Sequence, residues 1–257
     1  METIVLKFGG AAVATPDQFS SISDIIIERK SKFSNVAVVV SAMGNTTDDL
    51  ISLAKQVHPE PPTRELDMLI SVGERISISL LAMALNKKSC QAVSFTGSQS
   101  GIITCNSHSN AKIVDVRPSR ILDVMKNGKV AIVAGFQGMS LEREITTLGR
   151  GGSDTSAVAL GIALDSSAVE FFKDVDGVFD SDPKINPHAR QFPKLTYDEA
   201  LVIVRNGARV LHERSILLAK QSGIPLRIHS FYQNGVGTEI GLSEQKDQNS
   251  KLYELNV

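Results

Sequence analysis

The chain has 257 residues, of which 42% are hydrophobic and 21% charged, and its formal net charge is −1. This length allows one large or two modest domains, and the composition is that of a globular protein able to bury a sizeable core. The nearly balanced charge disfavours nucleic acid as a partner.

Targeting signals and cysteine frameworks are both missing from the sequence pattern. The N-terminus lacks the basic region, apolar core and cleavage site of a signal peptide, and no apolar run approaches the ~18 residues of a membrane span. We therefore expect a soluble, cytoplasmic protein without a membrane partner. Two cysteines, Cys90 and Cys105, are too few for a disulfide framework or a zinc site, and we expect both to be small buried apolar residues.

The first half of the chain alternates predicted strands and helices. Thr3–Phe8 is typical of a buried strand, and Asn35–Ser41, with valines at its centre, is typical of a central parallel strand. Between them, Thr15–Gln18 has the pattern of a capping box with proline at the first helical position, which predicts a helix to about Ser31. Further helices are predicted from Thr46, over Arg64–Leu85 and over Ser119–Met125, and further strands over Cys90–Phe95, near Gly101–Thr104 and over Val130–Ala134.

The second half continues the alternation. Helices are predicted over Ser156–Leu164, Tyr197–Asn206 and Val210–Gln221, strands over Ala168–Phe172 and Pro225–Ile228, a turn over Asn234–Gly237, and a frayed polar end after it. This order predicts an α/β fold, a three-layer α/β/α sandwich with a central, mainly parallel sheet. Without a repeat or a low-complexity linker, two lobes on one continuous sheet are favoured over two independent domains.

The glycine-rich stretch Gly149–Thr155 lies between an irregular segment, Glu142–Leu148, and a smooth apolar helix pattern. Its glycines, with Arg150 and Asp154 at a helix N-terminus, are typical of an anion-binding corner, because free N–H groups and the helix dipole favour a carboxylate or phosphate there. The alternative is a glycine-rich loop in which Asp154 only caps the helix. Neither interpretation is favoured by the stretch alone.

Several other polar segments follow predicted strands. In open parallel sheets, ligands bind beyond the carboxyl ends of the strands. Such ends carry Lys7 with Gly9-Gly10, Ser41–Thr47, Gly135–Gly138 and Lys173-Asp174. We expect them to converge on one crevice with Arg150 and Asp154. For Lys7 the alternative is a solvated lysine at a strand end, and for Glu74 an exposed helix residue paired with Arg75.

The residue types narrow the chemistry of this crevice. No Ser/His/Asp arrangement has a supporting local signature, no His/Cys cluster has metal-ligand spacing, and the Walker A order of residues is absent. Cations and N–H groups suit phosphates, whereas an arginine and a glutamate suit a zwitterion. This combination indicates phosphoryl transfer to a small amino acid.

Co-linear motifs over nearly the whole chain resemble those of aspartate kinases, within the amino acid kinase family. The matching segments are Lys7–Gly10, Val40–Asp48, Ser71–Arg75, Gly135–Gly138, Thr147–Thr155, Lys173–Phe179, Ser181–Lys184 and Val210–His212. The resemblance implies the amino acid kinase (carbamate kinase-like) fold, with residues 1–240 as the catalytic domain. Its amino-acid side is expected at about 1–150 and its ATP side at about 151–240.

The resemblance also implies substrates and a role for each matched residue. Arg150 would clamp a carboxylate of L-aspartate, Glu74 would accept its ammonium group, and Thr47 and Ser41 would hydrogen-bond it. Lys7 would bridge the ATP phosphates and Asp154 would hold Lys7. The ATP site would comprise Lys7, Phe8, Gly9, Gly10, Lys173, Asp174, Phe179, Asp182, Lys184, Arg209 and Val210. Mg²⁺ would be held mainly through the phosphates, with no protein metal ligands. No general base is needed, because a carboxylate with a reference pKa of about 4 is already ionised.

The sequence departs from the family pattern in three places. Ala11 and Ala12 stand where hydroxyl residues normally follow Lys-Phe-Gly-Gly, which removes possible hydrogen bonds worth about 1 kcal/mol each. Glu213 stands where the family has proline. Residues 241–257 form a short polar tail where regulatory ACT domains usually follow; a chain that ended at residue 257 would have no feedback through such domains in cis. A homodimer through the catalytic domain is possible.

Two alternatives to aspartate phosphorylation stay open at this point. One is kinase activity on another amino or carboxylic acid, since Glu74 and Arg150 also suit other zwitterions. The other is a catalytically weak homologue that acts as a binding or regulatory subunit, for which Ala11 and Ala12 are the only support.

Overall fold

The computed structural model describes residues 2–183, 185–232 and 235–241. Lys184, expected in the ATP site, lies outside the described residues, as do Asn234 of the predicted turn and all of the predicted polar tail after Gly241.

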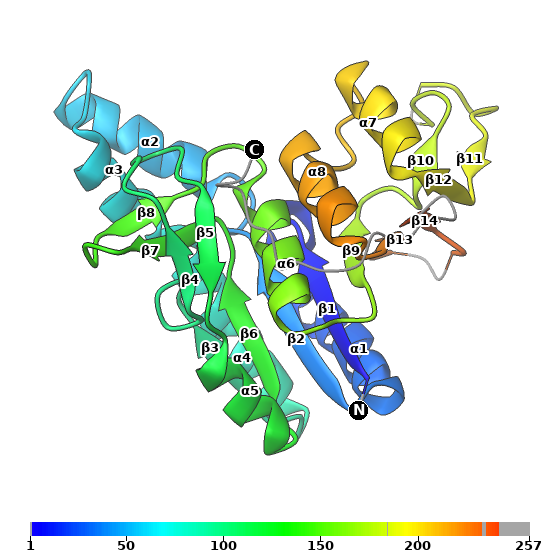
Figure 1. Cartoon of the computed structure of the whole chain (residues 1–257), viewed down its shortest axis with the longest axis horizontal. Helices are drawn as coiled ribbons and strands as arrows, with labels where there is room; N and C mark the ends of the chain where they lie inside the picture. The colour runs from blue at the N-terminus through cyan, green and yellow to red at the C-terminus, as the bar shows by residue number, and fades with distance from the viewer. Residues whose placement is uncertain (1, 184, 233–234, 242–257) are drawn as a thin grey trace.

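An eight-stranded sheet runs through the centre of the molecule (Figure 1). Its spatial order is β12 (Lys194–Thr196), β14 (Thr238–Gly241), β13 (Leu226–Ser230), β9 (Val169–Lys173), β1 (Thr3–Phe8), β2 (Asn35–Val40), β6 (Val130–Ala134) and β3 (Ala92–Phe95). Only the β13–β14 pair is antiparallel; every other neighbouring pair in this sheet is parallel. The central strands are apolar on both faces, as expected of strands covered by helices on both sides.

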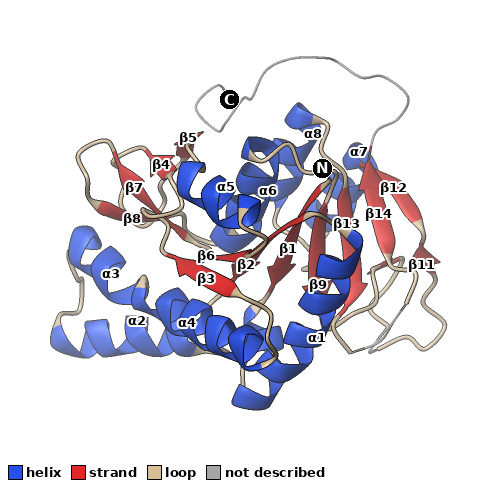
Figure 2. Ribbon diagram, turned by 90° about the horizontal axis from the view of Figure 1, so that it is seen from below, coloured by secondary structure: helices blue, strands red, loops and turns tan. Residues whose placement is uncertain are grey.

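Helices cover both faces of the sheet, as Figure 2 shows. One face carries α1 (Pro16–Lys32) and α4 (Val72–Lys87), and the other carries α5 (Ser119–Lys126), α6 (Gly152–Ala163) and α8 (Glu213–Ser222). Alternate residues of β1 belong to the two cores: Leu6 and Phe8 pack with α1 and α4, and Val5 packs with α6. The predicted three-layer α/β/α sandwich is therefore confirmed, and Lys7 is placed on the α6 face.

Two smaller groups of elements flank the carboxyl ends of the central strands. On one side lie α2 (Thr46–Val57), α3 (Thr63–Ile70) and a four-stranded sheet of order β5 (Ile113–Val116), β4 (Ile102–Thr104), β7 (Gln137–Ser140) and β8 (Ile145–Thr147) (Figure 1). On the other side lie α7 (Tyr197–Arg205) and the pair β10 (Val178–Phe179) and β11 (Gln191–Phe192). The large sheet contains strands from both expected lobes; the division into lobes itself stays a prediction.

Several element boundaries differ from the sequence-based expectation. The single helix expected over Arg64–Leu85 is α3 and α4 with a turn at Ser71, and α6 begins at Gly152 instead of Ser156. The helix expected from Val210 begins only at Glu213, because the His212 side chain caps it by accepting a hydrogen bond from the Arg214 N–H. The segment expected to be irregular before Gly149 contains β8, which pairs with β7. Cys90 and Cys105 are free and half-buried.

The helical stretch Thr63–Lys87 is long and apolar enough to cross a membrane by length and composition alone. However, 44% of its most apolar window is buried inside the protein, where α4 packs on the sheet. The core helix of a soluble protein passes the same test, so this property is weak evidence for a membrane span.

Candidate active site

The corner that begins α6 has the backbone of an anion-binding turn. Gly149 and Gly151 have φ values of 72° and 71°, in the left-handed region that favours glycine. A side chain at Gly151 would also collide with the ring of His212. No side chain caps the first turn of α6. The cap interpretation of Asp154 is therefore wrong, and its carboxylate is used elsewhere.

Asp154 lies between two lysines that come from different strands. Lys7 Nζ forms an ion pair with Asp154 Oδ1 at 2.5 Å. Lys173 Nζ donates to Asp154 Oδ2 at 3.4 Å. Lys7 is 4% exposed and Asp154 6% exposed, which excludes the solvated-lysine interpretation of Lys7. The β1–β9 register, which pairs Lys7 with Phe171, explains why both lysines reach the same helix.

The pKa values of this group follow from burial and from the neighbouring charges. Burial alone would raise the pKa of Asp154, but the charges of Lys173 and Lys7 outweigh it and hold the pKa at about 2. Burial lowers the pKa of Lys173 to about 8, against the attraction of Asp154 and with a contribution from Lys7. Two cations share one carboxylate, so the group carries a net positive charge at neutral pH that a phosphate can neutralise.

Glu74, in the first turn of α4, is a buried carboxylate without a cation in contact. It is 2% exposed, which excludes the exposed Arg75-paired interpretation. Its Oε1 accepts the Ala42 N–H at 3.1 Å, and its buried Oε2 has no hydrogen-bond partner among the described residues. Burial raises its pKa to about 7, although the Ala42 hydrogen bond and the charge of Lys7 lower it. A carboxylate with a free buried oxygen is suited to accept an ammonium group.

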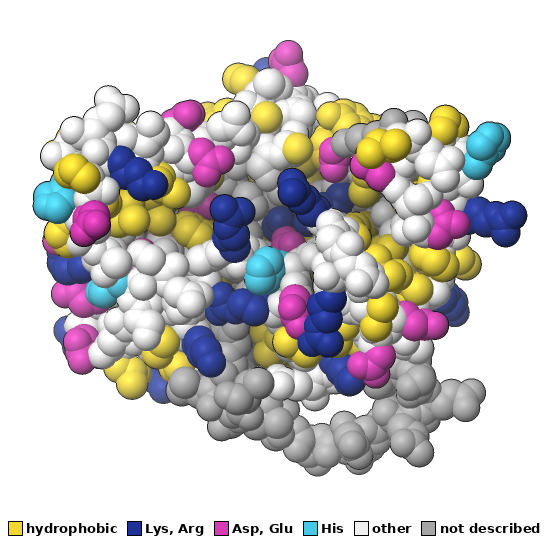
Figure 3. All heavy atoms as spheres, turned by 90° about the horizontal axis from the view of Figure 1, so that it is seen from above, with side chains coloured by type: hydrophobic (Ala, Val, Ile, Leu, Met, Phe, Trp, Pro, Cys, Tyr) yellow, Lys and Arg dark blue, Asp and Glu magenta, His cyan; other side chains and the backbone are white. Residues whose placement is uncertain are grey.

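A cavity of about 570 Å³ brings together most of the residues predicted to hold an amino acid. It is lined by Lys7, Gly10, Ser41, Thr47, Glu74, Arg150 and Asp154 among others. Arg150 is exposed and has no carboxylate partner within the part of the chain that the structure describes. Figure 3 shows Lys and Arg side chains gathered around a hollow in the middle of the face seen from above. This amino-acid cavity therefore offers a guanidinium and a carboxylate for the two charges of a zwitterion.

A second cavity, of about 850 Å³, lies between the end of β9 and the segment that follows α7. Six residues predicted for the ATP site line this nucleotide cavity: Lys173, Asp174, Phe179, Asp182, Arg209 and Val210. Apolar side chains of Val178, Phe192 and Ile203 complete its wall. A cavity with an apolar wall and charged residues at one side suits a base and its phosphates.

The remaining predicted ATP residues lie nearer to the amino-acid cavity. Gly10 lines it, and Gly9 is close to the Lys7 ammonium, since an added Cβ would be 3.7 Å from Nζ. The Phe8 side chain is fully buried and stacked on Phe172 at 4.7 Å between ring centroids, so only its backbone is available to a ligand.

The sequence profile of the amino acid kinase family matches residues 2–230. The chain belongs to this family. It is 48% identical over 241 residues to the aspartokinase of Mycolicibacterium smegmatis, covering 93% of the chain and 57% of that protein. Aspartate kinase from Synechocystis superposes with a TM-score of 0.84 at 39% identity, covering 96% of the chain and 40% of that structure. Aspartokinase III of E. coli, in a crystal structure with aspartate and ADP, superposes with a TM-score of 0.84 at 26% identity. That match covers 95% of the chain and 65% of the E. coli structure. The chain thus spans between 40% and 65% of the length of these three relatives.

Three departures from the family pattern have a structural context. Ala12 is fully buried in the core under α1, and Ala11 is exposed with its carbonyl accepting from Gln18 Nε2 at 2.8 Å. Neither alanine lines the amino-acid or the nucleotide cavity. Glu213 is the first residue of α8, where proline is favoured but not required, and it pairs with Arg205.

Five further polar or aromatic residues line the amino-acid cavity but were not predicted as site residues: Asp48, Ser109, Phe136, Thr147 and Ser153. Four of them lie in segments that the motifs already marked. Ser109 does not, because a loop between β4 and β5 brings it to the cavity, and no local sequence signal predicts that loop. Phe136 has a φ of 67°, unusual for a bulky residue, and its N–H donates to Ser156 Oγ at 3.1 Å.

Proposed function

We propose that the protein transfers the γ-phosphoryl group of ATP to the side-chain carboxylate of L-aspartate, which yields 4-phospho-L-aspartate and ADP. The arrangement Lys7–Asp154–Lys173 carries this proposal, because it lies where the amino-acid cavity meets the nucleotide cavity. The relatives named aspartokinases support it, as does the E. coli structure that holds aspartate and ADP. In biosynthesis, such a product begins the branch to lysine, threonine and methionine.

Each end of aspartate has a counterpart in the amino-acid cavity. Arg150 binds a carboxylate through its planar guanidinium, and Glu74 accepts the α-ammonium group on its free Oε2. Thr47 and Ser41, which also line this cavity, add hydrogen bonds to the amino acid. The side-chain carboxylate then points toward Lys7.

The transfer requires positioning and charge neutralisation but no proton movement. A side-chain oxygen of aspartate attacks the γ-phosphorus in line with the bond to the β-bridging oxygen. The new O–P bond forms as that bond breaks, and ADP leaves with the electron pair. The ammonium groups of Lys7 and Lys173 neutralise the negative charge on the phosphoryl group during the transfer, and Asp154 holds both ammonium groups in place. Mg²⁺ would be held mainly through the phosphates of the nucleotide and would neutralise part of their negative charge.

A coupled ADP-release assay with aspartate, glutamate and acetylglutamate tests the substrate. We expect turnover with aspartate and at least a hundredfold lower kcat/KM with the other two acids. Turnover with glutamate alone would contradict the proposal. In Lys7→Ala we expect aspartate-dependent ADP release to fall about a hundred- to a thousandfold, because a desolvated cation aimed at transition-state charge supplies about 3–4 kcal/mol. Nucleotide binding without any turnover in the unchanged protein would favour the regulatory-subunit alternative.

The assembly and location of the protein are also proposals. Apolar side chains are exposed on two neighbouring helices, Leu53 (52%) and Val57 (84%) on α2, and Ile76 (42%) and Met83 (66%) on α4. They support a homodimer through the catalytic domain, which sedimentation equilibrium would detect. We place the protein in the cytoplasm, where ATP and aspartate are both available.

A further inference from the structure

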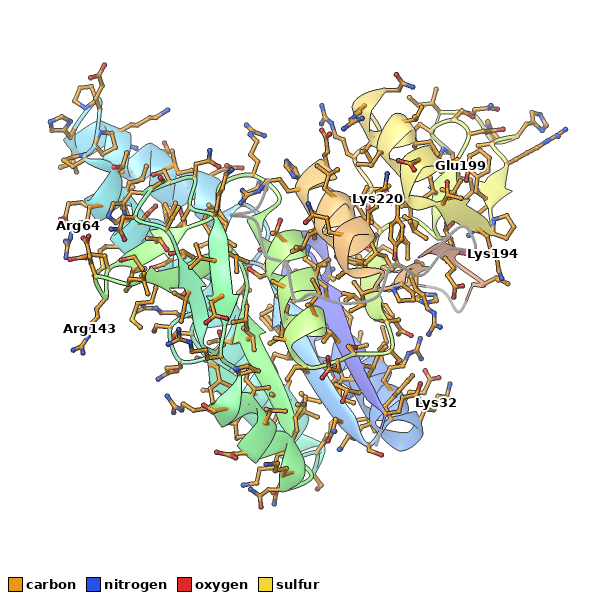
Figure 4. All side chains as sticks on the ribbon, in the orientation of Figure 1. Lys32, Arg64, Arg143, Lys194, Glu199 and Lys220 are labelled. Atoms are coloured by element: carbon orange, nitrogen blue, oxygen red, sulfur yellow. The ribbon has the colours of Figure 1, made fainter. Side chains whose placement is uncertain are left out.

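Asp67 is a fully buried carboxylate that lines neither the amino-acid nor the nucleotide cavity. It lies in the middle of α3, and its neighbour Leu66 contributes to the wall of the amino-acid cavity. Other charged residues of this helix face solvent: Arg64 points away from the molecule at its outer edge in Figure 4, and Arg64 pairs with Glu65 at 2.6 Å. Asp67 is therefore an inward-facing charge on a helix whose other charges face outward.

Three residues from two separate segments surround the carboxylate. Thr147 donates to it twice, from Oγ1 to Oδ1 at 2.6 Å and from its N–H to Oδ2 at 3.1 Å. Ser109 donates from its N–H at 3.1 Å to both oxygens and from Oγ to Oδ1 at 3.3 Å. His108 Nδ1 lies 2.8 Å from Oδ2. A buried carboxylate is costly without such partners, so this set of donors is specific for a charged acceptor.

The residues bonded to Asp67 are those that shape the amino-acid cavity. Ser109 and Thr147 both line it. Thr147 ends β8 three positions before Arg150, and the Ala111 N–H donates to the Thr147 carbonyl at 2.9 Å. A side chain at Gly149 would meet the carbonyl of Ser109 at 3.1 Å, so the two segments are in close contact beside Arg150. Among the described residues, the hydrogen-bond partners of the Asp67 carboxylate are Thr147, Ser109 and His108, and none of them lines the nucleotide cavity.

We propose that Asp67 is a positioning residue for the amino-acid half of the site. Its carboxylate ties the end of β8 and the loop of Ser109 to α3. Through these two segments it sets the position of Arg150 relative to Glu74, which follows in the helix after α3. Asparagine has the same shape but cannot replace the aspartate, because its NH₂ group is a donor and would face the N–H and O–H donors of Ser109 and Thr147. The inference rests on the proposed function and assigns a residue beyond the cavity to amino-acid binding.

The variant Asp67→Asn tests this role in the full chain, with Glu65→Gln as its matched control. Glu65→Gln removes a carboxylate from the same helix but from its exposed side. For Asp67→Asn we expect the KM for aspartate to rise at least tenfold while the KM for ATP stays within twofold. For Glu65→Gln both constants stay within twofold. An unchanged KM for aspartate, or equal rises in both constants, would overturn the inference, since a merely structural residue would not distinguish the substrates.

The variant His108→Ala keeps the test decisive if Asp67→Asn does not fold. His108 is at the surface end of the cluster, with 19% of its side chain exposed, and it lines neither cavity. We expect a two- to fivefold rise in the KM for aspartate alone. In the variant that combines Asp67→Asn with His108→Ala, the KM for aspartate should rise by less than the product of the two separate rises, because both changes act through one carboxylate. No effect of His108→Ala would overturn the inference when Asp67→Asn is unfolded. Absence of aspartate turnover in the unchanged protein would overturn the proposed function as well, which distinguishes the two failures.

Discussion

Glu74 combines two properties that rarely coincide in a carboxylate: it is almost fully buried, and one of its oxygens has no partner among the described residues. Burial raises its pKa to about 7, against the Ala42 hydrogen bond and the charge of Lys7. Before the substrate binds, the group is therefore half protonated near neutral pH. An incoming ammonium group favours the ionised form and lowers that pKa again. The proposed binding of the amino acid is thus expected to be coupled to loss of a proton.

This coupling predicts how the kcat/KM for aspartate depends on pH. The kcat/KM for aspartate should fall about tenfold for each pH unit below 7, because the protonated fraction of Glu74 grows in that range and cannot pair with the ammonium group. It should level off above pH 7.5. In Glu74→Gln we expect a low kcat/KM that is independent of pH between 5.5 and 7.5, measured by initial rates at saturating ATP. A profile that stays flat in the unchanged protein would show that Glu74 does not bind the ammonium group.

At the residue scale, the sequence predicts the chemical groups better than their surroundings. The motif positions Lys7, Glu74, Arg150 and Asp154 all reach one cavity. Sequence pattern could not show that Lys7 and Glu74 are buried, because burial depends on α6 and β2 packing around them from distant parts of the chain. Asp67 carried no signal at all, since its partners lie 41 to 80 positions away.

At the scale of elements, the start of α8 connects the nucleotide cavity with the glycine corner. The segment before it, including Arg209 and Val210, lines the nucleotide cavity. His212 packs on Gly151, and the Arg214 guanidinium donates to the carbonyls of Leu148 and Ala111, the latter at 3.0 Å. One helix start therefore contacts the segment that carries Arg150 and continues into the wall of the nucleotide cavity.

We predict that Arg214→Lys raises the KM for both substrates three- to tenfold. An ammonium group keeps the charge but cannot span two carbonyls as a planar guanidinium does. Lys220→Met is the matched control, because Lys220 is on the same helix but pairs with the exposed Asp198 at 2.5 Å and lines neither cavity. It should leave both constants unchanged in the same initial-rate assay. A change confined to one substrate would contradict the connecting role of this helix start.

The elements that were hardest to predict are short and depend on distant partners. Long apolar strands and capped helices were expected close to their observed positions because local patterns specify them. The strands β5, β7 and β8 have three or four residues each, and only pairing with β4 and with one another orders them. The same small sheet carries Thr147 and precedes Arg150, so the least predictable elements hold part of the amino-acid cavity.

At the scale of the whole molecule, the two proposed substrates are assigned to separate cavities, which a single charged group joins. The amino-acid cavity and the nucleotide cavity have no lining residue in common among the described residues. Lys7 and Asp154 belong to the first, Lys173 belongs to the second, and the two ion contacts of Asp154 link them. Strands β1 and β9, which are adjacent in the central sheet, supply the two lysines. The parallel sheet thereby fixes where the two cavities meet, which is the point at which the proposed transfer would take place.

This division predicts separable defects in three variants. Arg150→Lys should raise the KM for aspartate about ten- to a hundredfold and leave that for ATP unchanged, because charge-assisted bonds of about 1.5–3 kcal/mol are lost only on the amino-acid side. Arg209→Met should affect only the KM for ATP. Asp154→Asn should lower kcat with smaller effects on either KM, since it releases the two lysines from the meeting point of the cavities. Steady-state kinetics with each substrate varied in turn would measure all three. If Arg150→Lys and Arg209→Met instead produced the same pattern of defects, the two substrates would have to share one cavity, and transfer could not run across the Lys7–Asp154–Lys173 group.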